Sequence, residues 1–450
     1  MLGGCMGVPE PKPIQPVLPA LPQTDSPKPL HQMTDWWSPW QDKSIDFLLR
    51  AALHNNPGWK ARLEEIQAGR SEVGSVDRSY LPELHGVTET VLAPNGIDNY
   101  LQFGFDATWE LDLYGRKASN RLLARGALQH DTTLARATFF SLTAEVLRAY
   151  LEEQSLRQKS VLLDQQNHLL QQQEHMLKSQ AQLGLIPPLD STTLSQERFK
   201  IEQQQLNTQQ ALNRNRWRLA LLTGLSTARI AAMPPSPQIL PELRLPALPL
   251  NLLSEEPDVL QAQANLLEAA GQQGLARAAL YPSINISVGY LYAENVTQNR
   301  LGKFGELNGT PTFGPNIDVP IFDFERRLKH LQAQQHQLKA AIYDYQSAVI
   351  AAYRKTRDII DNFKSDLAIL SLFQRHDRQL KDIFELQQQQ LRLGLTAPSV
   401  LFATQLQSLQ NKQAMLQTQT QAALSWVALY KQLAWTGTKA ILPASGDAHS

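Results

Sequence analysis

The chain has 450 residues with 42 basic and 42 acidic side chains, so its formal net charge is zero. This balance gives no electrostatic footprint for a nucleic acid, and no apolar run is long enough for a membrane-spanning helix. The single cysteine, Cys5, allows neither an internal disulfide nor a thiolate cluster. The histidines show no metal-ligand spacing, and no GxSxG, Walker A or GxGxxG sequence occurs, so we expect no cofactor and no metal.

The chain begins with Leu2-Gly3-Gly4-Cys5, which is similar to a bacterial lipobox, where the cysteine is acylated. The charged and apolar regions of a signal peptide are missing upstream, so we expect the true start to lie further upstream. A chance cysteine in a tail is the alternative. Residues 8–30 hold eight prolines and predict an extended tether, although an ordinary disordered N-terminus fits almost as well.

The folded part is expected to open with a helical stretch from about Ser44 to Tyr80, interrupted at Asn55-Asn56-Pro57. A strand from Leu84 to Leu92 follows, then a turn at 93–96. The next strand has an apolar side chain at every second position: Leu101, Phe103, Phe105, Ala107, Trp109 and Leu111. Period two predicts a strand with two different faces. A half-buried strand of a soluble sandwich shows the same pattern.

A very long helix is predicted from Lys117 to Leu183, because this stretch has no proline. It would measure roughly 100 Å at 1.5 Å per residue. Two leucine-rich series at heptad spacing predict a coiled-coil seam: Leu162, Leu169, Met176 and Leu183, and Leu163, Leu170 and Leu177. Five glutamines are expected on its polar surface: Gln165, Gln166, Gln171, Gln172 and Gln173. After the break at 184–188, Asp190 to Leu225 is expected to run back as a helix.

The second half of the chain repeats the first. Tyr80-Leu-Pro82 matches Leu280-Tyr-Pro282, and Leu183-Gly184-Leu185 recurs as Leu393-Gly394-Leu395. Each half therefore predicts a helix, a hairpin, a very long helix, a tip and a returning helix. The second long helix is expected over 325–393 and its return over 397–433.

Four strands per chain are too few to close a barrel, since about eight is the smallest closed number. Aromatic residues edge these strands, as in the girdles of outer-membrane barrels, and an open sheet edge is not tolerated in lipid. The strands are therefore expected to join an oligomeric barrel, to which three copies would supply twelve strands. The expected membrane-facing residues are Leu101, Phe103, Phe105, Trp109, Ile286, Val288, Tyr290, Ile317 and Val319.

Several motifs together resemble the outer-membrane efflux channel proteins of the TolC kind, and most of all their lipoprotein branch (NodT- or OprM-like). The motifs are the LGGC start, Asp35-Trp36-Trp37, His54-Asn55-Asn56-Pro57, the WELDLYGR stretch at 109–116, Tyr281-Pro282-Ser283-Ile284, the VPIFD stretch at 319–323 and both LGL tips. The match covers about 35–435. It implies a homotrimer in the outer membrane of a Gram-negative bacterium, lipid-anchored, with a periplasmic helical tunnel. It also implies a periplasmic adaptor and an inner-membrane pump as partners, and passive export of small molecules.

The expected fold class is mixed α and β, mostly α, with long antiparallel coiled-coil helices and four membrane strands per chain in a twelve-stranded trimeric barrel. The expected divisions are the lipobox-like start and tether 1–34, a helical segment 35–83, barrel hairpin 84–112, long helix, tip and return 113–232, a connector 233–257, a helical segment 258–282, barrel hairpin 283–322, long helix, tip and return 323–436 and a tail 437–450.

The resemblance also implies that the two tips meet the adaptor: Leu183, Gly184, Leu185, Leu393, Gly394 and Leu395. Family members close the periplasmic end with acidic, aromatic and basic residues near the tips. Here Asp190 matches an acidic position, but Val400 and Ala403 stand at the others. Leu391 replaces the aromatic residue and Thr396 the basic one, with Arg392 the nearest cation. An apolar constriction of Leu391, Val400 and Ala403 is the simpler expectation.

Two alternatives stay open beside the channel. A soluble periplasmic coiled-coil scaffold or adaptor has no reason to present Phe103, Phe105 and Trp109 outward. An enzyme has no supporting group of residues in the sequence. Asp112 and Asp323 are isolated carboxylates at strand-to-helix junctions, where helix capping is the expected role.

Overall fold

The computed structural model describes residues 36–91, 100–183, 189–236, 239–241, 250–295 and 308–433. Its first half contains η2 (Ser38–Trp40), α1 (Lys43–Asn55), α2 (Pro57–Arg78), β1 (Glu83–Val91), β2 (Tyr100–Glu110), α3 (Arg116–Gln182), α4 (Leu189–Thr223) and α5 (Thr227–Ala231). Its second half contains η3 (Leu250–Glu255), α6 (Pro257–Ala278), β3 (Ser283–Asn295), β4 (Asn308–Asp318), α7 (Arg326–Arg392) and α8 (Pro398–Leu433). Among these helices none is both long enough and apolar enough to cross a membrane.

The predicted repeat of elements is confirmed. The two long helices α3 and α7 have 67 residues each and begin and end within one residue of the predicted bounds. The short helices η2, α5 and η3 were not predicted, because three to six residues carry too little periodicity to be recognised.

Local capping explains where the first helices begin. The Asp42 carboxylate accepts a hydrogen bond from the Ser44 N–H at 2.8 Å and caps α1. The predicted interruption at Asn56 is confirmed: its side-chain oxygen accepts from the Trp59 N–H at 3.0 Å, and Pro57 occupies the first turn of α2. Proline suits that position because its missing N–H would have no partner there.

Residues just before Pro57 and Pro257, the prolines that begin α2 and α6, bind the returning helix of their own half. Asn55 donates to the Thr223 carbonyl at 2.8 Å, beside Gly224, which has a φ of +70° where α4 ends. In the second half, Gln432 near the end of α8 donates to buried Glu256 at 2.8 Å. The repeat in sequence is therefore a repeat of tertiary contacts as well.

The described chain forms two compact units, and each unit takes segments from both halves. One contains Arg62–Leu134 and Pro257–Ile350; in it α3 and α6 approach so closely that a Cβ on Gly126 would lie 2.7 Å from Glu268 Cγ. The other contains 36–61, Ala135–Glu256 and 351–433. In it Trp36 stacks on Tyr430 with ring centroids 5.5 Å apart, and both side chains are buried.

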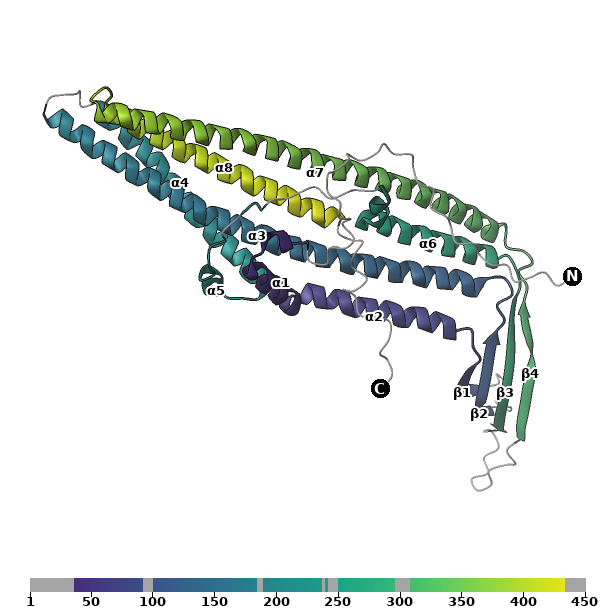
Figure 1. Ribbon diagram of the computed structural model, residues 1–450. Helices are drawn as coiled ribbons and strands as arrows, with labels where there is room; N and C mark the ends of the chain where they lie inside the picture. Colours follow the sequence, from purple (N-terminus) through teal and green to yellow (C-terminus); the bar gives the residue numbers. More distant parts are fainter. Residues whose placement is uncertain are drawn as a thin grey trace, which may run out of the picture. The chain divides into compact units, whose positions relative to one another are not determined.

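The four strands form one antiparallel sheet in the order β1-β2-β3-β4 (Figure 1). The strand order follows the chain order, so β2 and β3 join the two halves through the centre of the sheet. β1 and β4 each have one edge without a partner strand in the described part of the chain.

The coiled-coil prediction is confirmed for one leucine series and needs one correction. Leu163 and Leu170 of α3 are buried against Leu194 and Ile201 of α4, with Leu177 partly buried beside them. Gln166, expected on the polar surface, is buried instead, because α8 packs on that side of α3 and brings Gln413 within 3.5 Å.

Candidate channel wall, tips and sheet

The register of the sheet places its apolar side chains on one face. Phe103 faces Tyr292, Phe105 faces Tyr290 and Trp109 faces Ile286 across the β2–β3 pair. Residues opposite each other on paired strands share a face, and the β3–β4 pair continues it with Ile286 opposite Pro315 and Ile284 opposite Ile317. The other face carries mainly polar and glycine residues, among them Asp106, Thr108, Glu110, Asn285, Ser287, Asn316 and Asp318.

Most of the expected membrane-facing residues are exposed on this apolar face. Phe105 is 63 % exposed, and Phe103, Trp109, Val288, Tyr290 and Ile317 are also exposed. Leu101 and Ile286 are only half-buried, and Val319 is exposed just beyond the end of β4. Such a contiguous exposed apolar surface marks an interaction with a membrane or another protein.

The two strand-to-helix junctions confirm the capping role of their carboxylates. Asp112 accepts from the Arg116 N–H at 2.7 Å, and Asp323 accepts from the Arg327 N–H at 3.2 Å. Each aspartate therefore satisfies a backbone donor in the first turn of a long helix.

The second tip has a fully defined geometry. Gly394 has a φ of +69°, its N–H donates to the Leu391 carbonyl at 3.0 Å, and the Leu395 N–H donates to the Gln390 carbonyl at 2.9 Å. These two bonds with a left-handed glycine form a Schellman motif, which ends α7. Leu393 and Leu395 flank the glycine with 73 % of each side chain's surface exposed.

The other predicted site residues are placed only in part. Cys5, Gly184 and Leu185 lie outside the described residues, while Leu183 is exposed where α3 ends. Asp190 lies in the first turn of α4, and its side chain is not described.

Around the second tip, Val400 and Ala403 are exposed and three residues apart, hence on one face of α8. Leu391 and Thr396 are half-buried and Arg392 is exposed. The structure therefore leaves apolar side chains accessible near this tip.

Side-chain contacts arrange the tip-side helices in the order α4-α3-α8-α7. α3 joins α4 through Asp164, which accepts from Gln205 at 2.7 Å, and joins α8 through the hydroxyls of Ser155 and Thr420 at 2.7 Å. Thr404 of α8 donates to Gln387 of α7 at 2.8 Å. The two helical hairpins thus meet through their inner helices, α3 and α8.

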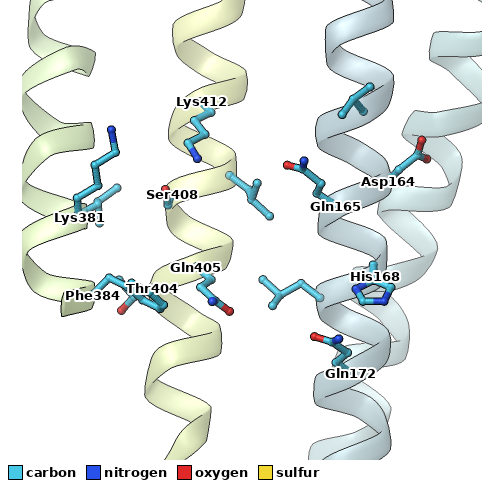
Figure 2. A pocket seen from close by; sticks show the side chains of 14 residues that line it. Asp164, Gln165, His168, Gln172, Lys381, Phe384, Thr404, Gln405, Ser408 and Lys412 are labelled. Atoms are coloured by element: carbon cyan, nitrogen blue, oxygen red, sulfur yellow. The ribbon is translucent and has the colours of Figure 1, made fainter. Parts of the chain in front are cut away.

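A groove of about 800 Å³ lies between these helices (Figure 2). Its walls come from α3, α7 and α8, and sequence reasoning missed it. The heptad pattern would have placed some of the lining leucines, but only the packing of both hairpins shows that a space remains between them.

Buried charges fix α3 to the segment that follows α4. Glu153 is 1 % exposed and is paired with Arg157 at 2.6 Å and with Arg216 of α4 at 3.2 Å. Arg157 also donates to the carbonyls of Ile230, Ala231 and Met233. Nearer the tip, hydrogen bonds from Lys178 and Arg198 lower the pKa of Glu174. These charged groups hold helices of the chain together.

A small antiparallel sheet with one exposed apolar face, joined directly to helices of 67 residues, defines an outer-membrane channel subunit with a helical tunnel. The family is identified by sequence: the chain belongs to the outer membrane efflux protein family, whose model matches residues 48–225 and 248–434.

The chain is similar to outer membrane protein OprJ of Pseudomonas aeruginosa, with 26 % identity over 89 % of this chain and 85 % of OprJ. It is 22 % identical to nodulation protein T of Rhizobium leguminosarum bv. viciae over 74 % of this chain and 70 % of that protein. The crystal structure of CusC matches 94 % of this chain and 99 % of the CusC chain with a TM-score of 0.79 and 21 % identity. The expected fold class, outer-membrane location and channel role are thereby confirmed.

Proposed function

We propose that three copies of this chain close a twelve-stranded barrel and form the outer-membrane conduit of a tripartite efflux system. The observation that carries the proposal is the four-stranded sheet, whose β1 and β4 edges have no partner in the described chain. Unpaired backbone groups are not tolerated in lipid, so each edge needs a strand from another copy. The exposed apolar face would then contact lipid.

Mass measurement of the protein in mild detergent tests this proposal. Three chains per particle are expected, with the particle resistant to dilution. A monomer that stays folded and soluble without detergent would contradict the proposal and favour a soluble periplasmic scaffold.

We infer a periplasmic adaptor and an inner-membrane pump as partners, with docking at the tips. The exposed Leu393 and Leu395 beside the rigid turn at Gly394 support docking at the second tip. Gly394→Trp should reduce adaptor cross-linking and export while the trimer persists. Gly394→Asn is the matched control, because asparagine tolerates positive φ and adds little bulk. Unchanged cross-linking in the tryptophan variant would reject this docking site.

We propose an apolar constriction near the second tip, made by Leu391, Val400 and Ala403. The exposure of Val400 and Ala403 on one face of α8 supports it. An apolar ring conducts poorly by dewetting, so resting conductance in planar bilayers should be low and divalent cations should block weakly. Val400→Asp should make that block strong. Strong block of the unmodified channel would overturn this gate.

We propose that Cys5 is acylated in the full-length precursor, as the family resemblance implies. The intact mass of membrane-extracted protein, expressed with a complete signal peptide, should show a lipid addition. Cys5→Ala should alter sorting more than folding, because the barrel anchors the chain independently. An unmodified thiol in the extracted protein would reject acylation.

We also propose that the segment boundaries predicted from the sequence are the structural divisions of the chain. We further infer that the chain is not an enzyme. OprJ is named as an outer membrane protein, and among the described residues no three His, Cys, Asp or Glu side chains are grouped to hold a metal. Passive conduction needs no such group, and cargo choice is then left to the pump.

A further inference from the structure

The groove between the two helical hairpins has the size of a small-molecule site. Its volume of about 800 Å³ falls in the range of roughly 300–1,000 Å³ that such sites occupy. Among the four helices α4, α3, α8 and α7, the groove opens between the two inner ones, α3 and α8. The outer helices, α4 and α7, carry the exposed apolar side chains available to neighbouring copies, such as Leu206 and Leu372.

The walls of the groove are amphipathic. The floor of the groove is apolar and is formed by Leu169, Leu380, Phe384 and Leu409. Leu169 is nearly buried, with 8 % of its surface exposed. Amide and hydroxyl groups rim it, and Figure 2 shows Gln165 of α3 and Gln405 of α8 pointing into the same space. A ligand with an apolar body and one polar end would satisfy both kinds of wall.

The charges that face the groove favour an anion at one side. Lys412 of α8 is half-buried, and no carboxylate pairs with it in the part of the chain that the structure describes. Its ammonium therefore supplies a positive charge at the groove that no carboxylate of the described chain neutralises. The other lysine, Lys381, is already paired with Asp377 at 2.7 Å. The lining carboxylate Asp164 accepts from Gln205 of α4, and Figure 2 shows it on the side of α3 that is turned away from Lys412.

We propose that this groove binds a small anionic amphiphile, with the anionic head on Lys412 and the apolar body over Leu169, Phe384 and Leu409. The site is assembled from α3 of one hairpin and α7 and α8 of the other. A bound ligand therefore bridges the two hairpins and stabilises their contact. Nothing in passive conduction requires such a site, and binding depends neither on trimer formation nor on the identity of the pump.

The probe for the test is 1-anilinonaphthalene-8-sulfonate, an anionic amphiphile whose fluorescence rises on binding. The full chain in lipid nanodiscs should bind it, and dodecanoate should displace it whereas dodecylammonium should not. Lys412→Gln should weaken binding roughly tenfold or more, since a charge-assisted contact is lost. Lys412→Arg should retain it. Lys200→Gln is the matched control, because exposed Lys200 of α4 does not line the groove.

A second measurement separates this site from adsorption to the membrane or the sheet. Dodecanoate should raise the midpoint of thermal unfolding in the unmodified chain and in Lys412→Arg, and much less in Lys412→Gln. Equal affinity of the unmodified chain and Lys412→Gln would overturn the proposal, and so would equal displacement by dodecylammonium.

Discussion

The two long helices, α3 and α7, have equal length and equivalent places in the repeat, but their surroundings differ. α3 has one exposed large apolar side chain, Val161, and buried residues along much of its length. α7 exposes seven: Leu328, Tyr343, Ile350, Ile369, Leu372, Ile383 and Leu386. α3 lies between other helices of its own chain, whereas α7 is the outer helix of its hairpin.

The repeat gives both helices the same length and a buried apolar stripe, but it does not give them the same exposed surface. Both helices have an inner apolar stripe, buried in α7 at Tyr345, Val349 and Phe363. Only α7 carries a second stripe that its own chain does not cover. Large exposed apolar surface on a helix marks an interface, so the second stripe fits a neighbouring copy in the proposed trimer.

The largest expected effect comes from charging the second stripe of α7. Ile369→Glu with Leu372→Glu should abolish the trimer, because two buried unpaired carboxylates would oppose association. The monomer should keep its helix content, since both side chains are exposed within it. Mass measurement in mild detergent, with circular dichroism alongside, checks this. Gln171→Glu on exposed α3 surface is the control, and a stable trimer of the double variant would show that α7 faces solvent.

The buried surface of α3 includes the ion pair between Arg157 and Glu153. Arg157→Met removes the 2.6 Å ion pair with buried Glu153 and three bonds to carbonyl groups. Arg216 remains 3.2 Å from Glu153, so the buried carboxylate keeps one cation, and the free energy of unfolding should fall by roughly 2–3 kcal/mol, measured by denaturant titration. Lys178→Met removes an exposed ammonium of α3 from Glu174 and should cost no more than about 1 kcal/mol. Equal losses in both variants would mean that Glu153 is hydrated in solution.

The sequence predicted the elements well because long periodic helices and alternating strands leave clear patterns. The bounds of α3 and α7, the break at Asn56 and the capping by Asp112 and Asp323 all depend on neighbouring residues in the chain. The burial of Gln166 and the groove beside Lys412 depend on how α8 packs against α3, and the contact of Gln166 with Gln413 joins residues 247 positions apart in the chain. No local pattern reports such packing, so these features could not be predicted.

Two buried tyrosines, one in each hairpin, should make the stability of the chain depend on pH. Burial raises the pKa of Tyr150 on α3, and burial raises the pKa of Tyr430 on α8 to about 12. Both stay neutral in the folded chain while the unfolded chain ionises above about pH 10. Stability should therefore fall as the pH rises from 10 towards 12.

For Tyr430 the expected loss at pH 11 is roughly 1 kcal/mol, since each pH unit above the unfolded pKa adds about 1.4 kcal/mol. Tyr430→Phe should remove the part of this pH-dependent loss that comes from Tyr430. The unmodified chain should therefore lose more stability between pH 9 and pH 11 than the variant. Denaturant titrations at both pH values check this, and identical losses would show that Tyr430 ionises freely.

The smallest expected effects concern the junctions that lead into α3 and α7. In the first half the left-handed position is Gly115, with a φ of +80°. In the second half Phe324 and Glu325 take φ values of +53° and +63°. Left-handed backbone costs an ordinary residue roughly 1–2 kcal/mol, whereas glycine adopts it freely. The second junction is therefore strained where the first is relaxed.

Gly115→Ala should accordingly destabilise the chain by roughly 1 kcal/mol, and Glu325→Gly should stabilise it by a similar or smaller amount, because the released strain is partly offset by the entropy of unfolded glycine. Glu325→Ala keeps the strain and removes the carboxylate, so it isolates the backbone contribution. Thermal unfolding of the three variants in the same detergent gives the comparison. If Glu325→Gly and Glu325→Ala shift the midpoint equally, the carboxylate and not the backbone separates the two junctions, and the strain assigned to the entry of α7 is wrong.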